Sequence, residues 1–143
     1  MRVHCLAQAP RLRRGAAVVE FAIIVPILTL LLLIVLDCCR LFYYSQVVEN
    51  CARNGALYAG DPFSPAHNLY PDVTTAAKAD ADASMQSLMN VNATYSTDAY
   101  GNEVSVTVTY PFSTITSYPG LPSSITITKT VQTRVAPAAP NGG

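Results

Sequence analysis

An apolar stretch from Ala16 to Leu36 constrains this chain more than any other feature of its sequence. Glu20 carries the only formal charge in these 21 residues, and Pro26 and Thr29 are the other interruptions. As a helix, the stretch would rise about 30 Å, which is the thickness of the hydrocarbon core of a bilayer. The sequence therefore predicts one membrane-spanning helix near the N-terminus.

Charge is distributed unevenly around this stretch. Four of the nine basic residues precede it, namely Arg2, Arg11, Arg13 and Arg14. The chain after Gly15 has five basic and nine acidic residues, a net charge of −4. The positive-inside rule predicts that residues 1–15 are a cytoplasmic leader and that the later part lies outside the cytoplasm. The negative sign of that later part argues against binding nucleic acid through its phosphates.

Helical periodicity continues beyond the apolar stretch. One helix face would collect apolar and small residues at spacings of three and four, namely Tyr44, Val47, Val48, Cys51, Gly55 and Tyr58. Gly60 and then Pro62 are typical of a helix end. We therefore expect one long helix over residues 16–60, which is apolar all round in its first half and amphipathic in its second half.

The remaining residues predict a small extracytoplasmic α+β domain over 61–135 and a disordered tail over 136–143. Asp72 is a candidate N-cap for a short helix over 73–89. Alternating apolar and polar residues then predict about three antiparallel strands. These strands centre on Val91, on the run from Val104 to Tyr110, which we expect Pro111 to end, and on Ile125 to Val135.

The sequence offers no constellation for catalysis, metal binding or a cofactor. His4 lies in the leader and His67 in a proline-rich loop, so they form no pair for acid–base work or metal binding. Asp80 and Asp82 are expected to point away from each other on the short helix and into solvent. The cysteines lack metal-site spacing, and Cys38, Cys39 and Cys51 are expected to be free thiols in the core or the membrane. We expect neither an enzyme nor a small-molecule substrate.

The junction between the leader and the apolar stretch is the most informative motif. A secretory signal peptide has its small-residue cleavage site after its apolar stretch, but here Asp37 and Cys38 follow. The small, basic-flanked junction instead lies before the stretch, at Gly15 and Ala16. This arrangement resembles the type IV prepilin signal, in which a basic leader and a glycine precede an apolar helix. Glu20 is the fifth residue counted from Ala16, where that signal has a glutamate.

The resemblance extends along the whole predicted helix. The segments from Arg14 to Ala22, from Arg40 to Tyr44 and from Ala52 to Ala59, with Pro26 between them, look like the TadE-like family of tight-adherence (Flp) pilus assembly proteins. The run from Val104 to Phe112 is similar to the distal part of that family. The resemblance implies a pilin-like fold and a pseudopilin or minor pilin that a prepilin peptidase cuts between Gly15 and Ala16. Phe21 in place of tyrosine, and the large distal domain, distinguish it from the small major pilins.

Two residues inside the apolar stretch are open to two interpretations. The resemblance implies that Glu20 pairs with the free amine of a neighbouring subunit during assembly, which would offset the cost of burying both charges. Alternatively, Glu20 lies at the membrane edge and reaches the interface. Pro26 either kinks the helix or is tolerated passively, as proline often is in membrane helices.

These features together predict a subunit of a Tad-type pilus or secretion system. The expected location is the bacterial inner membrane, with the N-terminus inside, and incorporation into a pilus is open. The expected partners are the membrane, other pilin-like subunits and a prepilin peptidase. The alternative is an unprocessed single-pass membrane protein with an extracytoplasmic adhesin or scaffold domain.

Overall fold

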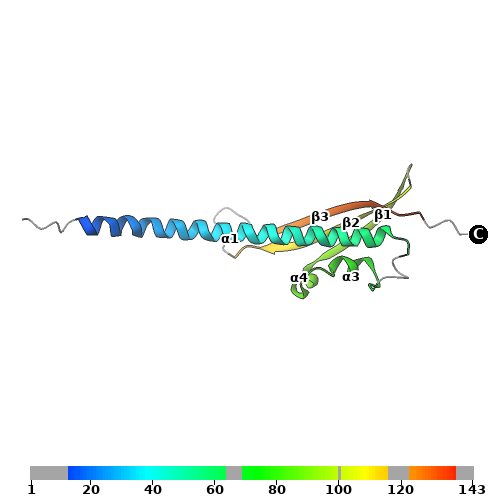
Figure 1. Ribbon diagram of the computed structural model, residues 1–143, viewed down its shortest axis with the longest axis horizontal. Coiled ribbons are helices and arrows are strands. Elements are labelled where there is room, and N and C mark those ends of the chain that lie inside the picture. Colours follow the sequence, from blue (N-terminus) through cyan, green and yellow to red (C-terminus); the bar gives the residue numbers. More distant parts are fainter. Residues whose placement is uncertain (1–12, 64–68, 100, 116–122, 138–143) are drawn as a thin grey trace, which may run out of the picture. The chain divides into compact units, whose positions relative to one another are not determined.

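The computed structural model describes residues 13–63, 69–99, 101–115 and 123–137 (Figure 1). The expected α+β, pilin-like order of a long helix, a short helical segment and a three-stranded antiparallel sheet is confirmed. The chain divides into two compact units, with the boundary between Asp37 and Cys38. The helix α1, Arg13–Gly60, contributes to both units, and each unit is described separately below.

The first unit consists of the N-terminal part of α1. The helix runs through Pro26 without a break, and Thr29 Oγ1 donates a hydrogen bond of 2.9 Å to the carbonyl of Val25. Such back-bonding satisfies a hydroxyl that would otherwise lie unpaired in an apolar environment. Most of the large apolar side chains in this unit are exposed, from Val18 to Leu36.

The second unit is built on a three-stranded antiparallel sheet with the order β1-β2-β3. Its strands are β1 (Asn90–Asp98), β2 (Gly101–Ser113) and β3 (Ser124–Arg134). The first pairing runs from Asn90 opposite Thr109 to Asp98 opposite Gly101. The second runs from Glu103 opposite Arg134 to Ser113 opposite Ser124. Gly101 has a φ of 128°, a conformation that a side chain would strain, so glycine belongs at this hairpin turn.

The two faces of the sheet differ, as the alternation in the sequence predicts. On β2 every second residue is buried, namely Val104, Val106, Val108, Tyr110 and Phe112. The opposite face carries Ser105, Thr107 and Thr109, and the hydroxyls of Thr107 and Thr130 lie 2.9 Å apart. The sheet therefore has one face in the core and one polar face, which is typical of an antiparallel sheet covered on one side.

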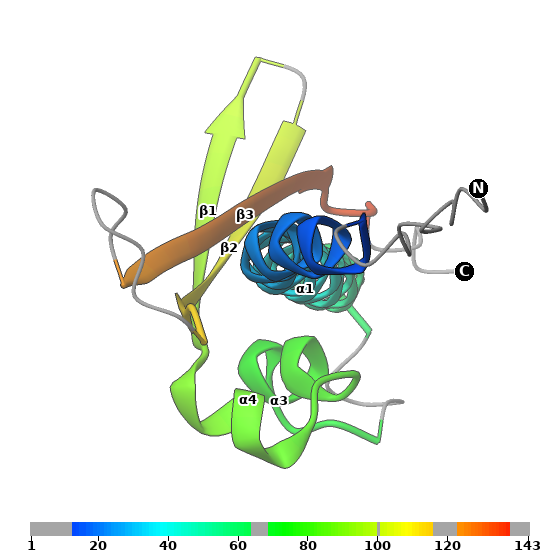
Figure 2. The ribbon, with the colours of Figure 1, turned by 90° about the vertical axis from the view of Figure 1, so that its left-hand side faces the viewer.

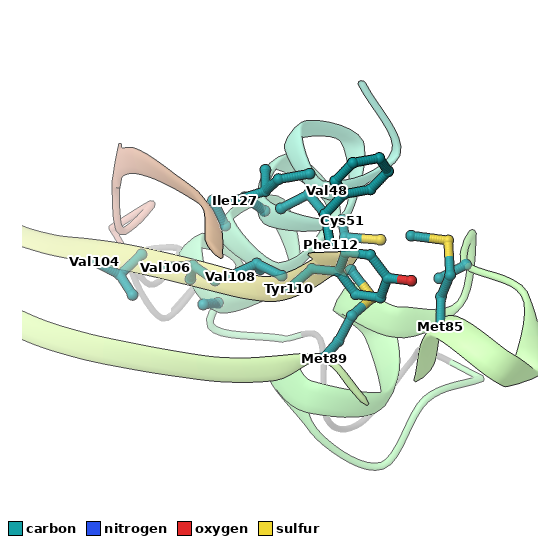
Figure 3. Packing of buried hydrophobic residues seen from close by; sticks show 14 residues of the cluster. Val48, Cys51, Met85, Met89, Val104, Val106, Val108, Tyr110, Phe112 and Ile127 are labelled. Carbon is teal, nitrogen blue, oxygen red and sulfur yellow. The ribbon is translucent and has the colours of Figure 1, made fainter. Parts of the chain in front are cut away.

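The second half of α1, from Cys38 to Gly60, covers the apolar face of the sheet (Figure 2). The helix face predicted from its spacing is confirmed, because Val48, Cys51, Gly55 and Tyr58 are all buried. Figure 3 shows Val48 and Cys51 facing the β2 side chains, with Met85 and Met89 completing the cluster from the side of the short helices.

Gly55 marks a close approach between elements in this core. A Cβ atom placed there would lie 2.9 Å from Ala77 Cβ and 3.0 Å from Val106 Cγ1. Both distances are shorter than ordinary van der Waals contact. The absence of a side chain at residue 55 therefore lets the helix fit between the sheet and the short helices.

The expected single helix over 73–89 is wrong. The structure has two short helices, α3 (Val73–Lys78) and α4 (Ala83–Leu88), with Asp82 in an extended conformation between them. Asp80 leaves the helical path and accepts a hydrogen bond of 2.8 Å from Asn54 Nδ2. Asp80 is exposed, as expected, but it lies outside both helices and has Asn54 as a partner. Asp72 caps α3 as predicted, accepting from the Thr75 amide at 2.8 Å.

Pro111 does not end the strand that it was expected to end. β2 continues to Ser113, and Pro111 pairs with Thr126 of β3. The pairing with β1 stops at Thr109, so Pro111 lies where β2 has a neighbouring strand on one side only. Proline lacks an amide donor and is tolerated at such edge positions.

Candidate processing and assembly site

The predicted site residues Gly15, Ala16 and Glu20 all lie on the N-terminal part of α1 and are all exposed. Ala16 and Glu20 are four positions apart, so they share a helix face with about 6 Å of rise between them. The helix thus presents the glycine–alanine junction and the carboxylate on one short, accessible segment.

Nothing in the described fold requires a glycine at residue 15. No atom lies within 4 Å of the position that a Cβ would take, and the backbone is not in the left-handed region. Glycine inside a helix costs about 1 kcal/mol relative to alanine, because it has more conformational freedom to lose. Gly15 differs in this respect from Gly55, where close packing explains the glycine.

Glu20 lies within an apolar surface. Val18, Val19 and Phe21 around it are each more than 60% exposed. Among the described side chains none forms an ion pair with Glu20; the ion pairs of Glu49, to Arg53 at 3.7 Å and Lys129 at 3.5 Å, lie in the second unit. A carboxylate at this depth of a membrane helix is costly, which makes it a candidate for a charged partner from outside this chain.

The three cysteines of the described chain are free thiols. Cys38 and Cys39 are exposed, and Cys51 is fully buried against the sheet. Burial raises the pKa of the Cys51 thiol, and the carboxylate of Asp80 raises that pKa further. Cys51 is therefore a packing residue with a poorly reactive thiol.

A shallow recess of about 300 Å³ lies between α1 and α3 in the second unit. Its lining includes Asn54, Tyr58, Asp61, Tyr70 and Asp80, and Tyr58 Oη donates to the carbonyl of Tyr70 at 2.9 Å. The described residues contain no group of three histidine, cysteine or acidic side chains able to hold a metal ion. His4 and His67 lie outside the described residues. The recess has carboxylates, amides and phenols, but no nucleophile paired with a base.

The apolar part of α1 is long enough to cross a membrane by length and composition. Its most apolar 18-residue window has a mean hydropathy of 2.9, and none of that window is buried within the protein. An apolar surface that no protein covers suggests a helix surrounded by lipid, and hence a membrane-anchored protein.

Comparison with protein families gives a match to the same helix. Residues 15–57 match the model of the TadE-like protein family. This segment of 43 residues is similar to the TadE-like protein family. This family match agrees with the resemblance seen in the sequence, and it suggests involvement in Tad pilus assembly. The searches of curated proteins and of solved structures found no match.

The TadE-like match covers α1 almost to its end and stops before the sheet. It includes Gly15, Ala16 and Glu20, as well as the buried face from Val48 to Gly55. The similarity of the run from Val104 to Phe112 lies outside the matched residues. The TadE-like family is a structural, pilus-associated one.

Proposed function

We propose that this TadE-like protein is a minor pilin or pseudopilin, a structural subunit of a Tad-type pilus or secretion system. A prepilin peptidase cuts between Gly15 and Ala16 and removes residues 1–15. The mature subunit stays in the bacterial inner membrane through residues 16–36, and residues 61–135 form its extracytoplasmic domain. Its partners are the peptidase and other pilin-like subunits.

The main support for this proposal is that residue 15 is a glycine although the fold has room for a side chain there. The helix would be more stable with another residue there, and no neighbouring atom would obstruct a side chain. Recognition by the peptidase would explain a glycine that the fold does not need. Gly15 is exposed and lies between the arginines and the apolar stretch, as the prepilin signal requires of the glycine at its cleavage site.

Glu20 acts in the assembly of cleaved subunits. Cleavage gives Ala16 a free amine, and on assembly the amine of one subunit pairs with the Glu20 carboxylate of its neighbour. Each buried charge then offsets the desolvation cost of the other. A neutral residue at position 20 would leave that amine without a counter-charge in an apolar bundle.

The variant Glu20→Gln tests this assembly role. We expect the variant to insert and to be cleaved normally, because a neutral amide is less costly in the membrane than a carboxylate. Its association with partner subunits should fall by at least about tenfold, since removing one partner of a buried ion pair is strongly destabilising. Crosslinking or co-purification from membranes measures the association, and the mass of the chain reports cleavage.

Glu49→Gln is the matched control on the same helix. Glu49 forms partly exposed ion pairs with Arg53 and Lys129 in the second unit, away from the apolar stretch, so this variant should associate as the wild type does. Normal association of Glu20→Gln would mean that Glu20 only reaches the membrane interface, and the assembly role assigned to it would be wrong.

A further inference from the structure

One end of the second unit carries exposed apolar side chains from α1, from β3 and from the segment that follows β2. On α1, Phe42 is 68% exposed and Tyr43 is 56% exposed. Just beyond the end of β2, Ile115 is 64% exposed, and Ile125 near the start of β3 is 37% exposed. These four residues are called the apolar rim below.

Contacts between α1 and β2 show that the rim residues lie at the same end of the unit. The ring of Tyr44 lies 5.6 Å from that of Phe112, and the guanidinium carbon of Arg40 lies 5.3 Å from the Phe112 ring. β2 reaches its last pairing at Ser113, and the amide of Thr114 donates to the carbonyl of Ser123 at 3.2 Å. Ile115 follows directly, up to about 10 Å beyond Phe112 along the strand direction.

The opposite end of the unit is fixed by other bonds. The Val135 amide donates to the Asn102 carbonyl at 2.9 Å, and the Ala136 amide donates to the Gly60 carbonyl at 2.8 Å. The start of β2 thus lies near the end of α1. β2 therefore runs antiparallel to this part of α1, and its far end, with Ile115, points toward Cys38, where the unit begins.

The segments that carry the apolar rim are uncharged apart from one arginine. In residues 38–44, 111–115 and 123–126, Arg40 is the only charged residue. Its guanidinium lies 5.9 Å from the centre of the Tyr44 ring as well as against Phe112. Tyrosine and arginine are typical of the boundary between lipid and water, where rings and aliphatic stems enter the apolar phase and charges reach phosphates.

The chain itself indicates what covers the rim. Cys38 follows within two residues of the apolar stretch that ends at Leu36, so the rim begins where the chain leaves the bilayer. We propose that the apolar rim rests in the lipid–water interface on the extracytoplasmic side of the same membrane, with Ile115 and Phe42 in contact with lipid. This contact holds the α+β domain against the membrane before assembly. The proposal rests on the membrane anchoring of the proposed function.

The chain contains no tryptophan, so single tryptophan residues can report on lipid contact. The full chain with Ile115→Trp is reconstituted in dilute vesicles of phosphatidylethanolamine and phosphatidylglycerol, with and without bromine on the upper part of the acyl chains. We expect blue-shifted emission that brominated lipid quenches. Phe42→Trp should behave in the same way.

Leu69→Trp is the matched control, because Leu69 is an exposed apolar side chain next to Tyr70, which bonds to Tyr58 near the far end of α1. Its emission should be red-shifted and unquenched. The proposal would be overturned if the emission of Ile115→Trp were equally unquenched. It would also be overturned if that emission were blue-shifted and depended on protein concentration but not on bromine, because this would indicate contact with a second copy of the chain. Leu30→Trp, within the apolar stretch, must be quenched; if it is not, the membrane anchoring itself is wrong.

Discussion

Two glycines of α1 show how differently the same residue type can be used. Gly15 has open space where a side chain would begin, whereas Gly55 lies against Ala77 and Val106. The space at residue 55 is filled from two sides, by a short helix and by the central strand. We attribute Gly55 to packing, and we propose that Gly15 is recognised by a processing enzyme.

Gly55→Ala tests the packing half of this contrast. The added methyl group would overlap Ala77 Cβ and Val106 Cγ1, neither of which is the end of a long flexible side chain. Overpacking of this kind costs about 1–3 kcal/mol, which exceeds the gain of up to about 1 kcal/mol in helix propensity. We expect a lower melting temperature by circular dichroism of the second unit's fold. A variant at least as stable as the wild type would show that the helix and sheet are more loosely packed than described.

The residue types alone could not reveal the close approach at Gly55. The sequence placed Gly55 on the buried face of the helix, because its spacing from Cys51 and Tyr58 fits one stripe. Its neighbours Ala77 and Val106 come from elements that are distant in sequence. The bond between Asn54 and Asp80, 26 residues apart, was likewise beyond local patterns.

At the scale of elements, the strand with strict alternation was predicted correctly, whereas the short helix was not. The alternation from Val104 to Tyr110 predicted the central strand and its buried face correctly. Residues 73–89 have helical spacing throughout, yet the helix is interrupted near Asp80 and Asp82. There Lys78 Nζ donates to the Gln86 carbonyl at 2.9 Å, and Gln86 Nε2 donates to the Ala81 carbonyl at 2.7 Å. These side-chain bonds to the backbone compensate for the helical bonds that the turn loses.

Val106→Asp tests whether the predicted face of β2 is the core. Val106 is 0% exposed, so aspartate would place an unpaired charge between α1 and the sheet. We expect a loss of several kcal/mol, enough to unfold the second unit. Ser105→Asp, on the opposite polar face of the same strand, is the control and should change stability little. Chemical denaturation of both variants, followed by circular dichroism, gives the comparison; equal stability of the two would contradict the assigned faces.

At the scale of the whole molecule, the family match covers most of α1 but does not reach the sheet. The helix is recognised by its family model, and its apolar part suggests a membrane anchor. The orientation across the membrane stays a prediction from charge, since four arginines precede the apolar stretch. The leader over residues 1–15 and the tail over 136–143 lie mostly outside the described residues, so those boundaries stay predictions.

A reporter fused after Val135 tests the orientation. We expect alkaline phosphatase at this position to be active, because it folds only outside the cytoplasm, and a cytoplasmic reporter at the same position to be inactive. Replacing Arg11, Arg13 and Arg14 with glutamate should weaken this preference, since the basic flank sets it. Cytoplasmic activity of the wild-type fusion would reverse the orientation and remove the basis for a pilin role.

The N-terminus of the chain isolated from membranes tests the central claim most directly. The intact mass and terminal sequence are measured after expression with and without a prepilin peptidase, for the wild type and for Gly15→Leu. A leucine side chain has room at this position, so the helix should persist while the peptidase no longer cuts. We predict that the wild-type chain begins at Ala16 only when the peptidase is present, and that Gly15→Leu keeps its arginine leader. A wild-type chain that still begins near Met1 beside an active peptidase would contradict the account and favour an unprocessed membrane protein with an extracytoplasmic binding domain.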